Sequence, residues 1–140
     1  MASGICNALK PICNPRFPLD ESESKNLLKL YFNDVGLLTR LLYQYNITAV
    51  MDEQKGINLG TVYELAVCSE LSAHGFPLFY YDNKKKGEVE FLVNDYDSLT
   101  VVPIEVNSGK DYDQDASLDH FVETPDYNIK KGYVLCNERE

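Results

Sequence analysis

The sequence predicts an α/β domain in which a mixed β-sheet is flanked by helices. One observation is a set of apolar-rich extended runs in the second half of the chain, at 76–82, 87–95, 100–107 and 132–136. The other is a pair of helical runs, one from Gly60 to Ala73 and one from about Gln114 to Glu123. Strands and helices in this order favour one sheet covered by helices. A chain of 140 residues has room for one domain with its own core.

The composition narrows the class of protein. Hydrophobic residues make up 44%, charged residues 25%, and the formal net charge is −9. An acidic chain is a poor non-specific binder of nucleic acid, because phosphate neutralisation supplies most of that affinity. It still allows an enzyme whose acids hold a metal ion. No apolar run approaches the ~20 residues that cross a bilayer, and no secretory signal is visible, so we expect no membrane partner.

Cysteine and motif usage point to a reduced, cytoplasmic protein. Four cysteines show no C-x-x-C pair, and Cys68 and Cys136 lie in apolar runs where a thiol serves as a small hydrophobe. A zinc site is disfavoured because His74 and His120 are far apart. There is no G-x-x-x-x-G-K-[ST], so we expect no nucleotide bound by a P-loop in this chain.

The first part of the chain is expected to contribute little core. Residues 1–24 are rich in proline, serine and glutamate, and are predicted to be a linker or the remnant of a preceding region, with a short extended piece from Ile5 to Ile12. The domain itself is predicted over 25–140. It begins with an extended run from Leu30 to Asn33 and a helix for which Asp34 is the N-cap.

Later boundaries come from capping and breaking residues. Residues 51–58 are predicted to be a loop, and Gly75 is placed to end the helix that begins at Gly60. Residues 83–87, which include three lysines, read as a turn. Pro125 stops the second helix.

The hairpin from Gly87 to Lys110 has a register that brings two acids together. A turn over Tyr96 to Leu99 pairs Asp95 with Thr100, and continuing the ladder sets Glu90 opposite Glu105 and Glu88 opposite Asn107. One face of this hairpin is then wholly apolar, which supports the register. It carries Val89, Phe91, Val93, Val102, Ile104 and Val106.

The two acids of the hairpin allow two interpretations. Carboxylates directly opposite one another repel unless a cation bridges them or one is protonated. Mg²⁺ or Mn²⁺, which prefer oxygen ligands, would bridge Glu90 and Glu105. The alternative is a solvated sheet face on which the two side chains splay apart.

Glu64 is the only charge in the run from Thr61 to Cys68. A helix covering the sheet could aim this acid at the strand carboxylates. The alternative is that Thr61, Glu64, Cys68 and Ser72 form the outer, wetter stripe of the helix.

An acid on a helix, an acid on a strand and E-x-K on the next strand are the pattern of the PD-(D/E)XK nuclease-like fold, here Glu64, Glu90 and Glu105-Val106-Asn107. The chain resembles one family from about Arg16 to the end. The resemblance rests on four segments, KLYFNDVGLLTRLL, NLGTVYELAVCSEL, FYYDNKKKGEVEFLV and IEVNSGK. This family is the domain of unknown function at the C-terminus of a group of prokaryotic AAA-type ATPases. The resemblance implies a restriction-endonuclease-like core and an upstream ATPase region, so that this chain would be a fragment and that region its partner.

Two departures from the family pattern matter. The family usually has Asp where Glu90 stands and Lys where Asn107 stands. The resemblance implies that this lysine holds the attacking water and stabilises the negative charge that develops on the phosphate. A neutral amide such as that of Asn107 does both poorly. Lys110 could substitute only from a shifted position in a loop.

Three functions follow from the resemblance. The first, favoured by Asn107 and the acidic charge, is a non-catalytic accessory domain that recognises DNA or a protein partner. The second is an active Mg²⁺-dependent phosphodiesterase, in which Glu90 and Glu105 bind metal, Glu64 assists and Lys110 replaces the lysine. The third is a protein-interaction module with no metal. Under the first two, Lys84, Lys85 and Lys86 would contact phosphates; otherwise they form a solvated turn.

Overall fold

A computed structural model describes residues 6–22, 29–32, 60–107 and 116–136. The predicted helix that begins at Asp34, the predicted loop at 51–58 and Lys110 lie outside these residues.

The described strands form a six-stranded mixed sheet in the order β2-β1-β3-β4-β5-β6. β1 pairs with β3, and β5 with β6, in parallel, while the other neighbours are antiparallel. The predicted α/β fold with a mixed sheet is therefore confirmed. The strands are β1 (Cys6–Ile12), β2 (Lys29–Phe32), β3 (Phe79–Asn83), β4 (Gly87–Asp95), β5 (Thr100–Asn107) and β6 (Tyr133–Cys136). The helices are η1 (Leu19–Glu21), α3 (Gly60–Ala73), α4 (Ala116–Glu123) and η3 (Pro125–Tyr127).

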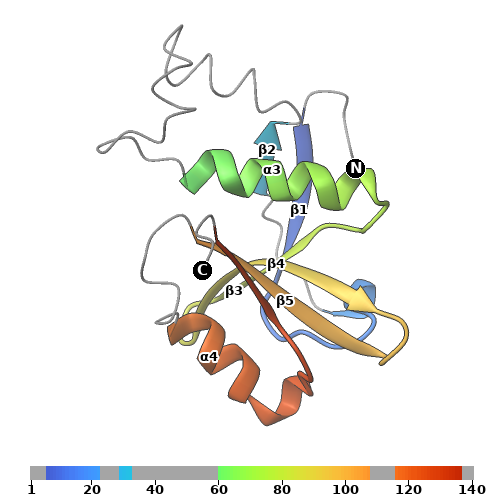
Figure 1. Cartoon of the computed structure of the whole chain (residues 1–140). Helices are drawn as coiled ribbons and strands as arrows, with labels where there is room; N and C mark the ends of the chain where they lie inside the picture. Colours follow the sequence, from blue (N-terminus) through green and yellow to red (C-terminus); the bar gives the residue numbers. More distant parts are fainter. Residues whose placement is uncertain (1–5, 23–28, 33–59, 108–115, 137–140) are drawn as a thin grey trace, which may run out of the picture.

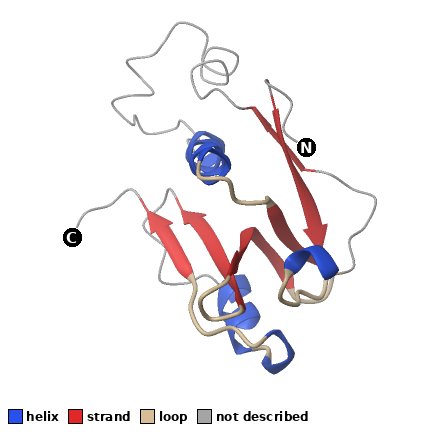
Figure 2. Cartoon of the chain, turned by 90° about the vertical axis from the view of Figure 1, so that its right-hand side faces the viewer, coloured by secondary structure: helices blue, strands red, loops and turns tan. Residues whose placement is uncertain are grey.

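Within the described residues, the α-helices α3 and α4 cover opposite faces of the sheet, which gives three layers (Figure 1, Figure 2). On one face, the α3 cluster packs Val62, Leu65 and Cys68 of the helix against strand residues. These strand residues are Leu9, Tyr31, Phe91, Val93, Val102 and Ile104. Of the hairpin acids, Glu90 is half-buried and Glu105 is buried, so the predicted solvated face is not observed for these two residues.

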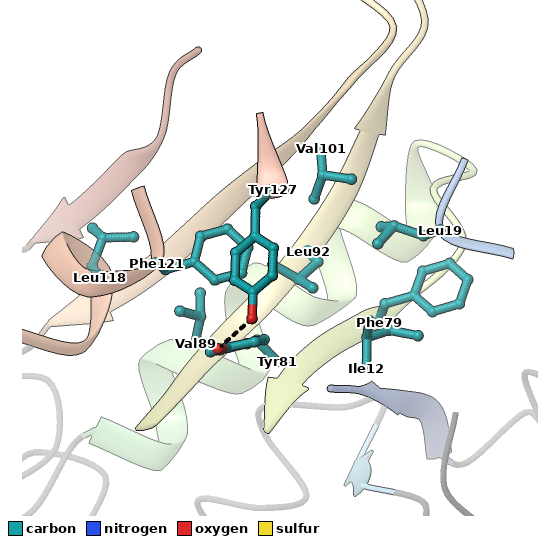
Figure 3. Packing of buried hydrophobic residues seen from close by; sticks show 10 residues of the cluster. All are labelled: Ile12, Leu19, Phe79, Tyr81, Val89, Leu92, Val101, Leu118, Phe121 and Tyr127. Carbon is teal, nitrogen blue, oxygen red and sulfur yellow. Dashed lines mark hydrogen bonds between the residues drawn. The ribbon is translucent and has the colours of Figure 1, made fainter. Parts of the chain in front are cut away.

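The α4 cluster fills the opposite face (Figure 3). Leu118 and Phe121 of α4, with Tyr127 of η3, pack against the middle strands, and the Tyr81 and Tyr127 hydroxyls lie 3.0 Å apart in a hydrogen bond. The remaining members are Ile12, Leu19, Phe79, Val89, Leu92 and Val101.

α3 ends as its sequence predicts. Gly75 has φ +82°, and its N–H donates to the carbonyl of Ser72 while the N–H of Phe76 donates to that of Leu71. This pair of bonds is a Schellman motif, which glycine favours because it lacks a Cβ. β3 then begins at Phe79, three residues later than predicted.

The N-terminal segment contributes far more core than its composition predicts. β1 lies between β2 and β3, and Leu9, Ile12 and Leu19 are at most 1% exposed. The expectation of little core before residue 25 is therefore wrong. The division into residues 1–24 and 25–140 stays a prediction, because a shared sheet does not reveal which region of a longer chain a strand comes from.

The hairpin has the predicted turn and, next to it, the predicted register. β4 and β5 pair antiparallel from Asp95–Thr100 to Phe91–Ile104, around a turn at residues 96–99. The predicted pairs Glu90–Glu105 and Glu88–Asn107 are not among the observed pairs of this ladder.

The pairing of β4 with β3 contains a bulge that the sequence did not indicate. Phe79 pairs with Leu92 and Tyr81 with Val89, so that Glu90 and Phe91 together oppose Tyr80 alone. One extra residue reverses the alternation of faces beyond it. Val89 accordingly joins the α4 cluster, whereas Phe91 and Val93 belong to the α3 cluster. The predicted common face of Val89 with Phe91 and Val93 is therefore wrong.

Candidate functional site

Glu64 lies on the sheet-facing side of α3. It is half-buried, and its Oε2 accepts a hydrogen bond of 2.8 Å from the hydroxyl of Tyr31 on β2. Cys68, one turn further along, is completely buried. The predicted outer stripe that included Glu64 and Cys68 is therefore wrong.

Glu90 is turned toward α3 by the bulge of β4. Its Oε2 accepts a hydrogen bond of 2.7 Å from the backbone N–H of Val106, and its carboxyl group is hydrogen-bonded to that of Glu64. Bulges often re-aim a side chain in this way next to functional sites. Glu64 and Glu90, called here the carboxyl pair, thus lie together beneath α3.

The electrostatics of the carboxyl pair favour one shared proton. The pKa of Glu90 rises from its ordinary value of 4.5 to about 9. Burial is the largest cause, followed by the hydrogen bond to Glu64 and the charges of Glu105 and Glu64, while the N–H of Val106 acts in the opposite direction. At neutral pH, Glu90 is therefore protonated and donates to Glu64.

Glu105 lies on the opposite face of the sheet from the carboxyl pair. Alternation along β5 puts Val102 and Ile104 in the α3 cluster, and Glu105 on the side of Val101. Glu105 pairs with Val134, which packs against the α4 cluster, and it is only 7% exposed. The face that the hairpin register predicts for Glu90 and Glu105 together is therefore not observed, because the bulge moves Glu90. Glu105 still acts on Glu90 through its charge.

Asn107 borders an apolar cavity of about 220 Å³ between α3 and the edge of the sheet. The other lining residues are Tyr63, Ala66, Val67, Val106, Leu135 and Cys136. No lysine or arginine is among them, so the described part of this cavity offers no cation at the third position of the E-x-K pattern. Cys136, predicted to be a small hydrophobe within its strand, is exposed.

The lysine turn lies between β3 and β4, and Lys84, Lys85 and Lys86 are exposed. The backbone N–H groups of Lys85 and Lys86 donate to Oδ1 of Asn83, at 3.0 and 3.2 Å, and fix the turn as an Asx-type structure. The Nζ of Lys86 lies 5.3 Å from the ring centroid of Tyr127, in the α4 cluster. Lys86 thus points to the face opposite the carboxyl pair, while Lys84 lies in the same exposed turn.

Sequence reasoning missed the two side chains that β2 adds to the site. Tyr31 is 6% exposed, and its ring centroid lies 5.9 Å from that of Phe91. The Nζ of Lys29 lies 5.3 Å from the ring centroid of Tyr31 and 5.5 Å from that of Tyr80. The only signal was that Lys29 and Tyr31, two residues apart on a strand, share a face.

Carboxylate oxygens suit Mg²⁺ and Mn²⁺, but the described residues do not complete a metal centre. Within them, no group of three histidine, cysteine, aspartate or glutamate side chains is arranged to hold a metal ion. The carboxyl pair offers two acidic ligands, and the third acid of the pattern is on the other face.

These features define a class: a three-layered α/β domain with a buried carboxyl pair under the helix on one face of its sheet. Residues 59–140 match the family model described as a domain of unknown function, DUF4143. This match spans more than half of the chain, which therefore belongs to the DUF4143 family. No curated protein and no solved structure matches the chain. None of the helices in the described residues has the length and apolar character needed to span a membrane.

Proposed function

We propose that this chain is a nuclease-like accessory domain that does not cleave nucleic acid. In this proposal the domain has a PD-(D/E)XK, restriction-endonuclease-like core, follows the ATPase region of a cytoplasmic AAA-type ATPase, and recognises nucleic acid or a protein partner. The order of a helix acid, a strand acid and Glu105-Val106-Asn107 on the next strand supports this assignment. The exposed Lys84, Lys85 and Lys86 are the candidate phosphate contacts.

The placement of the three strand positions supports a domain that does not catalyse cleavage. Cleavage by such a pattern needs the strand acids and a cation to meet at one phosphate. Here Glu90 is hydrogen-bonded to Glu64, Glu105 lies on the other face, and Asn107 is a neutral amide beside an apolar cavity. These three positions are split between two faces, so we derive no catalytic step through a metal ion.

A cleavage assay tests this proposal. We expect the wild-type chain to leave plasmid DNA and single-stranded oligonucleotides intact when Mg²⁺ or Mn²⁺ is present in large excess over the protein. We expect Asn107→Lys to leave both substrates intact as well, because Glu105 stays on the other face of the sheet from Glu90. Cleavage by Asn107→Lys would show that only the cation had been lost, and would contradict the structural reason for the lack of cleavage. Cleavage by the wild type that disappears in Glu90→Gln would contradict the proposal itself. That result would favour an active phosphodiesterase, with Lys110 as the residue to replace next.

A second experiment asks which acids hold a divalent cation. Mn²⁺ is titrated calorimetrically into the wild type and its variants. Saturable binding by the wild type whose affinity falls at least about tenfold in Glu90→Gln would place the cation on the carboxyl pair. Glu105→Gln should bind almost as well as the wild type, because Glu105 faces the α4 cluster. If Glu105→Gln loses binding instead, Glu90 and Glu105 share the metal.

The protein-interaction module without metal is the second candidate. The observation that favours it is the hydrogen bond between Glu64 and Glu90, in which a proton already relieves the repulsion that a metal would relieve. A wild-type chain that does not bind Mn²⁺ would establish this candidate over the metal-binding one.

A further inference from the structure

Tyr31 connects the carboxyl pair to a strand outside the family match. The match covers residues 59–140, whereas Tyr31 lies on β2 and reaches Glu64 across the α3 face of the sheet. A hydroxyl group that is 6% exposed needs a hydrogen-bond partner, and Glu64 supplies it at 2.8 Å.

The phenol is held in place from several sides. The centroid of the Tyr31 ring lies 5.9 Å from that of Phe91, the neighbour of Glu90. The Nζ of Lys29, two residues earlier on β2, lies 5.3 Å from the same Tyr31 centroid. Such aromatic and cation–π contacts restrict the ring. The hydroxyl can therefore fix the rotamer of Glu64 without itself being free to move.

The hydrogen bonds of the carboxyl pair converge on Glu64. The Tyr31 hydroxyl donates to Glu64, the carboxyl group of Glu90 is hydrogen-bonded to Glu64, and the N–H of Val106 donates to Glu90. A phenol has a hydroxyl proton at neutral pH and a carboxylate oxygen has none, so Tyr31 is the donor of this bond. Each carboxyl group thus has one backbone or tyrosine donor that sets its orientation.

We propose that Tyr31 is a positioning residue for the carboxyl pair, so that the site is built from β2 as well as from the family-matched region. Its hydroxyl holds Glu64 in the rotamer that meets Glu90. The part of this proposal that concerns binding of a divalent cation rests on the proposed function, whereas the effect of Tyr31 on the orientation of Glu64 does not. The arrangement also gives the segment before residue 59 a direct physical means of altering the site.

The test compares Tyr31→Phe with Tyr81→Phe. Both changes remove one buried tyrosine hydroxyl that has a partner, but the Tyr81 hydroxyl bonds Tyr127 in the α4 cluster. The side-chain carboxyl carbons of Glu64 and Glu90 are followed by NMR in the metal-free protein at one pH, and Mn²⁺ affinity is measured by calorimetry.

We expect Tyr31→Phe to shift the Glu64 and Glu90 carboxyl resonances and to weaken Mn²⁺ binding about tenfold, as outer contacts of metal ligands do. Tyr81→Phe should leave both unchanged. Unshifted carboxyl resonances in Tyr31→Phe, or a wild-type Mn²⁺ affinity, would overturn the proposal. If the wild type itself binds no Mn²⁺, the metal part of the proposed function fails, and the carboxyl resonances alone decide the role of Tyr31.

Discussion

Glu90 is the residue at which the local environment most changes chemical behaviour. A carboxyl group whose pKa is about 9 is neutral at physiological pH and acts as a hydrogen-bond donor. This neutral donor makes the close approach to Glu64 possible. The sequence pattern of an acid on a strand therefore does not by itself imply a negative charge at that position.

The raised pKa of Glu90 makes stability depend on pH. Between its ordinary value of 4.5 and about 9, the folded chain holds a proton that the unfolded chain releases. The contribution of Glu90 to the free energy of unfolding is therefore fully present below about pH 4.5. It declines as pH rises toward 9, by at most about 1.4 kcal/mol per pH unit.

Glu90→Gln should remove this slope, because the amide keeps an acceptor for Val106 and a donor for Glu64 at every pH. Urea unfolding at pH 5 and pH 8 gives the measurement. The variant should match the wild type at pH 5 and exceed it at pH 8. Glu70→Gln, at an exposed position on α3, the helix that carries Glu64, is the control and should retain the wild-type slope. An unchanged slope in Glu90→Gln would show that another group causes it.

At the scale of elements, two turns decide how the hairpin meets its neighbours. The turn at 96–99 sets the register with β5, while the lysine turn leads into β4 through Gly87, whose φ is +106°. An added Cβ at Gly87 would lie 2.6 Å from Oγ and 3.2 Å from Cβ of Ser117 on α4. Close approach of this turn to α4 therefore depends on glycine.

Gly87→Ala should destabilise the chain more than Gly75→Ala does. Gly75 also has positive φ, at +82°, but an added Cβ there would meet nothing within 4 Å. We expect Gly75→Ala to lower the free energy of unfolding by about 1 kcal/mol, because of backbone strain. Gly87→Ala should lower it by about 1–2 kcal/mol more, because α4 must shift to make room for the Cβ. Chemical denaturation of both variants measures this difference.

Ser117→Ala provides a check on the cause. Ser117→Ala removes the Oγ that would lie closest to the added Cβ. When it is combined with Gly87→Ala, it should therefore recover part of the unfolding free energy that Gly87→Ala loses. Equal losses in the two glycine variants, with no recovery, would mean that the contact with α4 contributes nothing.

At the scale of the whole molecule, the sheet joins segments from both ends of the described chain. β1 and β2 lie before the family-matched residues, yet Leu9 and Tyr31 belong to the same cluster as Leu65 and Phe91. The cluster on the other face likewise combines Leu19 with Tyr127. Folding of the matched region therefore uses apolar surface supplied from outside it.

Leu9→Ala should test this dependence. Leu9 is completely buried, and a truncation of this kind costs about 2–5 kcal/mol of unfolding free energy. Leu30→Ala on the paired strand is the matched control, because Leu30 is 62% exposed and its loss should cost under about 0.5 kcal/mol. Thermal and urea unfolding of both variants compare them. Similar small effects would show that β1 is only loosely attached.

Part of the candidate site follows from sequence reasoning. The helix that carries Glu64, the strands that carry Glu90 and Glu105, and the hairpin register from its turn to Phe91–Ile104 are observed where the pattern predicts them. The faces of these acids could not be predicted, because one extra residue opposite Tyr80 reverses the side to which Glu90 points. The catalytic, metal-binding and phosphate-binding roles of the site residues stay predictions.

The sequence by itself determined the positions of α3, the hairpin and the Gly75 cap, since periodicity, turn residues and capping act between residues close in the chain. Only the tertiary structure decided that β1 enters the sheet, that a bulge sends Glu90 beneath α3, and that Tyr31 donates to Glu64. The place of β1 and the bond of Tyr31 depend on packing between distant segments, with Tyr31 and Glu64 33 residues apart. The bulge arises between neighbouring strands, but the face to which it turns Glu90 depends on where α3 packs. Local patterns contain no information about which distant surface a strand will meet.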